Sequence, residues 1–77
     1  MANFPLCTTI KIYRNIFNRG IICVDIVCDD GFIFNFEWCS NEFSIREILA
    51  AAKILARTHQ IRYTDIPAEF QDIYNNM

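Results

Sequence analysis

Two apolar runs separated by Asp29-Asp30-Gly31 constrain the fold of this chain more than any other feature. The tripeptide suits a three-residue hairpin loop, in which a type I turn is followed by a left-handed residue, a conformation that glycine adopts without a Cβ penalty. A two-residue loop would slip the register by one residue and turn every side chain to the opposite face. The three-residue loop pairs Cys28 with Phe32, and the apolar face then carries the pairs Ile26 with Phe34, Val24 with Phe36 and Ile22 with Trp38.

A first strand precedes this hairpin. Residues 8–17 alternate between apolar and polar side chains, as a half-buried strand does. Residues 18–20, Asn-Arg-Gly, predict a second three-residue loop with the same turn chemistry. The pairs that this loop predicts are Phe17 with Ile21, Ile16 with Ile22 and Ile12 with Ile26. Arg14 then falls on the inner face opposite Val24, where at an edge strand its charge can reach outward to water.

The hydrophobic period then changes to that of a helix. Ser44 and Glu47 form a capping box, and Phe43 can pack against Ile48 as a hydrophobic staple. The pattern predicts a helix that runs to Thr58. Its apolar stripe, which we expect to cover Phe32, Phe34, Phe36 and Trp38, consists of Ile45, Ile48, Leu49, Ala52, Leu55 and Ala56.

A second, shorter helix is predicted over residues 64–74. Thr64 or Asp65 would cap it, and Pro67 is tolerated in a first turn. Its apolar edge consists of Ile66, Phe70, Ile73 and Tyr74.

These elements predict one small α+β domain over residues 1–77. Its expected architecture is a three-stranded antiparallel β-meander followed by two helices (β-β-β-α-α), with the helices packed on one face of the sheet. Residues 1–7 are expected to form a short leader that Pro5 interrupts.

Charge and hydropathy exclude several classes of protein. The net charge of −2 disfavours a protein that binds nucleic acid by neutralising phosphates. The amino terminus lacks the basic start and apolar run of a signal peptide, and no stretch is long and apolar enough to span a membrane. We therefore expect a cytoplasmic protein that does not contact membranes; the alternative is a secreted chain from which a signal peptide has been removed.

Four cysteines raise the question of disulfides and metals. No CxxC spacing occurs, and Cys23 and Cys28 would point to opposite faces of one strand, so they cannot share a metal ion. Cys23 and Cys39 share the outer face and could pair in an oxidising setting. We predict reduced structural thiols, with Cys28 in the core, and neither a metal site nor a cofactor.

No catalytic motif is apparent. His59, the single histidine, falls at the end of the long helix, where its ring can interact with free carbonyl groups. Asp25 and Glu37 lie near each other on the outer face, where solvated charges need no further explanation. The sequence therefore favours a protein without enzymatic activity.

The outer face of the predicted sheet is too apolar for a fully solvated surface. It could be covered by the leader or the second helix, by a second copy joined sheet to sheet or edge to edge, or by another protein. We predict a protein-binding surface in which aromatic anchors lie within a polar rim. Its residues would be Tyr13, Phe17, Ile21, Asp25, Ile33 and Glu37.

The alternative is a small regulator that touches nucleic acid. A basic strip follows the exposed face of the long helix, although acidic residues lie nearby and such faces are usually only solvated. The strip consists of Arg46, Lys53, Arg57 and Arg62.

In size and style the chain is similar to the short accessory proteins of phages and other mobile elements, which often bind and block a host protein. This similarity supplies no site residues. It favours an inhibitor or adaptor that acts on a protein partner.

Overall fold

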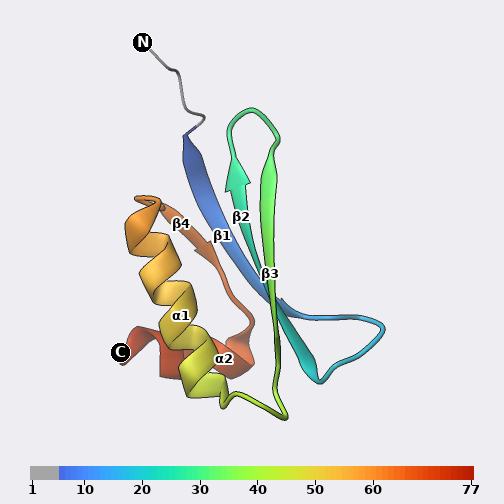
Figure 1. Ribbon diagram of the computed structural model, residues 1–77. Coiled ribbons are helices and arrows are strands. Elements are labelled where there is room, and N and C mark those ends of the chain that lie inside the picture. The colour runs from blue at the N-terminus through green and yellow to red at the C-terminus, as the bar shows by residue number, and fades with distance from the viewer. Residues whose placement is uncertain (1–5) are drawn as a thin grey trace.

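The computed structural model describes residues 6–77, so most of the predicted leader lies outside the described part of the chain. Four strands and two helices follow one another in these residues (Figure 1). Their bounds are β1 Cys7–Arg14, β2 Ile21–Cys28, β3 Ile33–Cys39, α1 Ile45–Thr58, β4 Tyr63–Asp65 and α2 Ala68–Asn75.

The sheet is mixed and has the order β3-β2-β1-β4. β1, β2 and β3 are antiparallel neighbours, as predicted, but β4 lies parallel to β1 (Figure 1). The prediction of a three-stranded meander is therefore wrong in strand number. The residues expected to cap the second helix, Thr64 and Asp65, belong to β4 instead, and α2 begins later with Pro67 at the N-cap and no side-chain cap.

The β2–β3 hairpin forms in the predicted register. Ile26 pairs with Phe34 and Val24 with Phe36. In the turn, Gly31 has a φ of 88°, and its N–H donates to the carbonyl oxygen of Cys28 over 3.0 Å. The left-handed glycine that the loop type requires is thus present.

The β1–β2 register differs from the prediction by two residues. Ile12 pairs with Val24 rather than with Ile26. The strand ends earlier than expected because the N–H of Asn15 donates to the carbonyl oxygen of Ile21, which closes a longer loop over residues 15–20. A shift of two residues keeps each side chain on its face, so the inner and outer faces of β1 remain as predicted up to Arg14.

Gly20 has a different role from the one predicted. It is not left-handed; a Cβ at this position would lie 3.2 Å from the Oδ1 atom of Asn18. A side chain at this position would therefore press on the Asn18 carboxamide, whose Oδ1 accepts the N–H of Gly20.

The core joins one face of β1 and β2 to both helices. All residues of the predicted stripe of α1 and of the predicted apolar edge of the second helix take part in it, although Ile66 of that edge precedes α2. The Ser44–Glu47 capping box is also present. These predictions are confirmed. The buried cluster consists of Ile10, Ile12, Ile22, Val24, Ile26, Ile48, Leu49, Ala52, Phe70 and Tyr74.

The aromatic row of β3 lies at the margin of this core rather than at its centre. Phe32 and Phe34 are 55% and 40% exposed, whereas Phe36 and Trp38 are half-buried. The prediction that α1 covers all four rings is therefore wrong, because the most deeply buried strand residues lie on β1 and β2.

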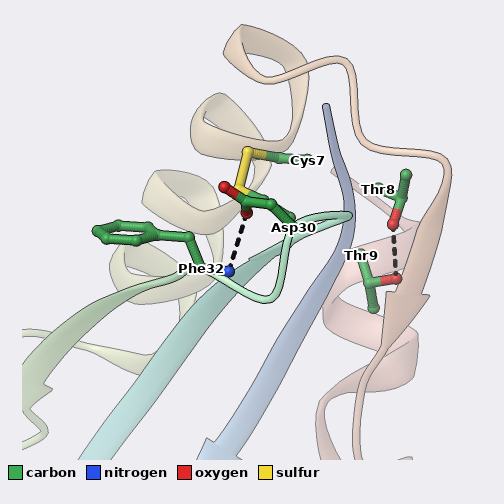
Figure 2. Close-up of a disulfide and its surroundings, with 6 residues drawn as sticks. Cys7, Thr8, Thr9, Asp30 and Phe32 are labelled. Atoms are coloured by element: carbon green, nitrogen blue, oxygen red, sulfur yellow. Dashed lines mark hydrogen bonds between the residues drawn. A yellow bond between two sulfur atoms is a disulfide. The ribbon is translucent and has the colours of Figure 1, made fainter. Parts of the chain in front are cut away.

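A disulfide joins Cys7 to Cys28, contrary to the prediction of reduced thiols (Figure 2). Cys7 opens β1 opposite the last residue of β2, with a register irregularity between Cys7 and Thr9. The predicted register started the strand at Thr8 and left Cys7 in the leader, so this pair was missed. Cys23 and Cys39, which share the outer face, are free thiols.

Arg14 has ion-pair and aromatic partners on α2. It lies opposite Ile22, not Val24. Its Nε donates to Oε1 of Glu69 over 2.7 Å, and its guanidinium lies 5.2 Å from the centre of the Phe70 ring. α2 therefore supplies an acidic partner for the inward-facing charge of Arg14, which was expected from the sequence to reach solvent.

Candidate protein-binding surface

A polar network crosses the outer face of the sheet at Asp25 of β2. Its carboxylate accepts the hydroxyl of Tyr13 from β1 over 2.8 Å and the side-chain amide of Asn35 from β3. Cys23, two residues from Asp25 along β2, donates its thiol hydrogen to Oε2 of Glu37 on β3 over 3.6 Å. The middle of the outer face is thus tied together across three strands.

The Tyr13 phenol and the Cys23 thiol of this network both have raised pKa values. Burial, followed by the hydrogen bond from Tyr13 to Asp25 and the charge of that carboxylate, raises the pKa of the Tyr13 phenol well above its usual range. Burial, followed by the charge of Glu37, raises the pKa of the Cys23 thiol. Both groups keep their protons at neutral pH, so neither is activated as a nucleophile.

The β1–β2 loop presents large apolar side chains to solvent. Phe17 is 92% exposed and Ile16 is 80% exposed. Figure 1 shows the loop extending beyond the sheet, away from both helices. Hydration of such strongly exposed apolar side chains is thermodynamically unfavourable. We call Ile16 and Phe17 together the apolar tip.

Hydrogen bonds hold this loop in one shape. Asn15 Oδ1 accepts the main-chain N–H groups of Phe17 and Asn18 over 2.8 and 3.1 Å, and Asn18 Oδ1 accepts the N–H of Gly20 over 3.0 Å. Arg14, anchored on α2, donates through Nη1 to the carbonyl oxygen of Arg19 over 2.8 Å. The apolar tip therefore sits on a braced loop.

The predicted binding residues divide into three groups. Phe17 lies in the loop, with the half-buried Ile21 where β2 leaves it. Tyr13, Asp25 and Glu37 belong to the polar network in the middle of the face.

Ile33 is 52% exposed and lies near the β2–β3 turn, opposite Val27 at the far end of the sheet from the loop. Sequence reasoning missed Ile16, which it assigned to the inner face. The signal was the pair of asparagines at 15 and 18, which favour side-chain-to-backbone turns.

The predicted basic strip is brought together only in part. Arg46, Lys53 and Arg57 line a pocket of about 330 Å³ whose other lining residues are Ala50, Ile54 and Met77. Lys53 donates to the main-chain oxygen of Met77 over 3.1 Å. Arg62 lies apart, in a second pocket with His59.

His59 lies at the C-terminal end of α1, as predicted, but it is its main-chain N–H that donates to the carbonyl oxygens of Leu55 and Arg57. Its ring, which was expected to interact with these carbonyl groups, lies 6.0 Å from that of Phe34. Within residues 6–77, histidine, cysteine and acidic side chains do not gather in a group of three that could hold a metal ion. Over the same residues, no helix is long and apolar enough to cross a membrane.

The chain matches no protein-family model, and no curated protein or solved structure is similar to it at a significant level.

Proposed function

We propose that this protein is a non-enzymatic binding module that acts as an inhibitor or adaptor of another protein. Its contact would be made by the apolar tip, Ile16 and Phe17, with Tyr13 and Ile21 at its base. The observation that carries the proposal is the exposure of Phe17, at 92%, on a loop braced by asparagine side chains.

Two physical effects support this proposal. Burying a side chain such as Phe17 in a partner's pocket contributes about 1.5 to 3 kcal/mol. A braced loop also loses little conformational freedom on binding, which lowers the entropic cost of association. An apolar anchor on a rigid support is typical of an interface hot spot.

The experiment compares a loop variant with a matched surface variant. Tagged wild-type protein is used to capture proteins from a nuclease-treated lysate of the source cell under non-reducing conditions. The affinity of the purified partner is then measured for Ile16→Ser with Phe17→Ser, and for Ile54→Ser. The loop variant should lose at least about 30-fold in affinity. Ile54, which is 63% exposed on α1, serves as the control and should change it little.

The proposal is wrong if wild-type protein captures no stoichiometric partner, or if the loop variant binds as tightly as wild type. Circular dichroism of both variants establishes that the fold is retained.

A second candidate, a regulator that touches nucleic acid, is favoured by the three basic residues that share one pocket. In the same capture experiment without nuclease, this function predicts recovery of nucleic acid that Lys53→Glu with Arg57→Glu abolishes.

The proposal also includes the cytoplasmic location and the likeness to phage accessory proteins expected from the sequence. The Cys7–Cys28 disulfide weighs against the location, because disulfides persist mainly in oxidising compartments.

A further inference from the structure

The two edges of the sheet differ in their protection. β4 forms one edge with three paired residues and is soon followed by Pro67. β3 forms the other edge over the seven residues Ile33–Cys39, which include no proline or lysine and a single charge, Glu37. Natural proteins usually shorten or charge an edge strand to prevent pairing with another chain. β3 lacks that protection.

The hydrogen bonds of the β2–β3 hairpin show which main-chain groups face the free edge. At one end of the hairpin the N–H of Cys28 donates to the carbonyl oxygen of Phe32 over 2.9 Å. At the other end the N–H of Ser40 donates to the carbonyl oxygen of Gly20 over 2.7 Å. Because bonded and non-bonded pairs alternate in an antiparallel ladder, the even-numbered residues of β3 bond to β2. The residues that direct their N–H and C=O groups outward are Ile33, Asn35, Glu37 and Cys39.

An incompletely covered aromatic row accompanies this free edge on the helix side of the sheet. Phe32 and Phe34 are 55% and 40% exposed, and their ring centres lie 4.8 Å apart. Phe36 and Trp38 continue the row and are half-buried. A contact at this edge would therefore satisfy free main-chain groups and remove aromatic surface from water at the same time.

We propose that the occupant of this edge is a second copy of the protein, with the two β3 strands antiparallel about a two-fold axis at Phe36. A second copy supplies both a matching unprotected edge and a matching aromatic row. Phe36 is the midpoint of Ile33–Cys39, so this axis pairs all seven residues of the strand. The result is one continuous sheet in which the two aromatic rows adjoin.

Side-chain chemistry selects this register over its neighbours. With the axis at Phe36, Asn35 faces Glu37 of the second copy on the outer face, and the two can form a hydrogen bond. An axis at Glu37 would bring two carboxylates face to face, which is destabilising. An axis at Asn35 would pair only residues 33–37 of the strand.

The first test separates main chain from side chain at Glu37. Glu37→Pro removes an outward N–H without touching the bonds to β2, whereas Glu37→Ala removes the same side chain and keeps that N–H. We expect wild type and Glu37→Ala to be dimers by sedimentation equilibrium. The two-fold axis removes two hydrogen bonds in Glu37→Pro, which should raise the dissociation constant by about 100-fold.

Three results would overturn the proposal. The first is a wild-type protein that stays monomeric at several hundred micromolar, roughly the weakest range of specific association. The second is a Glu37→Pro variant that dimerises as tightly as wild type. The third is a Glu37→Ala variant that is monomeric. The last would mean that the carboxylate, and not the strand edge, holds the copies together.

A second test determines the register in which the two β3 strands pair. Residues at position 36 form a non-hydrogen-bonded pair, in which Cα atoms lie about 4.5 Å apart, within the range that a disulfide spans. Phe36→Cys should therefore cross-link two copies on mild oxidation, whereas Phe34→Cys, which faces Trp38, should not. Equal cross-linking of both variants contradicts the register.

This dimer is independent of the proposed function, because Ile16 and Phe17 lie on the β1–β2 loop and not on β3. The loop variant, Ile16→Ser with Phe17→Ser, should keep the dimer, so the two proposals can fail separately.

Discussion

Asp25 shows at the scale of single residues what sequence reasoning could and could not supply. The alternation of the strands correctly placed Tyr13, Asp25 and Glu37 on one face. The β2–β3 register also correctly placed Asn35 opposite Asp25, but strand alternation could not show that the carboxylate accepts two side chains, because those bonds depend on side-chain rotamers. These side chains therefore tie the three strands of the sheet together.

The Tyr13 network predicts a stability that falls at high pH. Because the pKa of Tyr13 is raised in the folded protein, the folded state keeps a proton that the unfolded state loses above about pH 10. The free energy of unfolding should decrease as pH rises beyond that point. Tyr13→Phe should lose about 0.5 to 1.5 kcal/mol at pH 7, through the missing hydrogen bond, and depend less on pH above 10.

Urea unfolding followed by Trp38 fluorescence between pH 7 and 11 measures this difference. Tyr63→Phe, at a tyrosine that is 66% exposed, is the control and should follow wild type. Parallel curves for wild type and Tyr13→Phe would contradict the pH argument.

At the scale of elements, a helix, strand or turn could be predicted from the sequence where the residues that specify it lie close together in the chain. The β2–β3 turn and the α1 capping box are specified within a few residues, and both are present as predicted. The β1–β2 loop depends on hydrogen bonds that the Asn15 side-chain oxygen accepts, and these override the turn that was predicted from Gly20. β4 is three residues long, and all three are exposed, so its sequence has no hydrophobic periodicity. Only its pairing with β1 identifies it as a strand.

The position of the core predicts which apolar substitutions are costly. Leu49→Ala, at a fully buried site on α1, should destabilise the protein by about 2 to 5 kcal/mol. Phe34→Ala should cost less than half as much, because its ring is 40% exposed. Chemical denaturation at low micromolar concentration compares the two variants, and an equal loss would place the aromatic row in the core after all.

At the scale of the whole molecule, the candidate surface was only partly predictable. Phe17 was identified because it fell outside the apolar pattern of the inner face, whereas its exposed neighbour Ile16 fitted that pattern and was assigned to the core. The Cys7–Cys28 disulfide was missed because it depends on where β1 begins and on an irregularity in its register. Such long-range features emerge only when all the elements are assembled.

The disulfide and the exposed loop lie at opposite ends of the β1–β2 hairpin, and this has a consequence for proteolysis. Chymotrypsin should cleave readily after Phe17, the most exposed aromatic residue described. The piece that carries Cys7 would stay bonded to the piece that carries Cys28, and β1 would remain paired between β2 and β4.

Digested protein should therefore run as one species on a non-reducing gel and as two on a reducing gel. Separation without reductant would contradict the cross-link. A protein built in this way can lose the continuity of its main chain at the apolar tip and still behave as a single folded molecule.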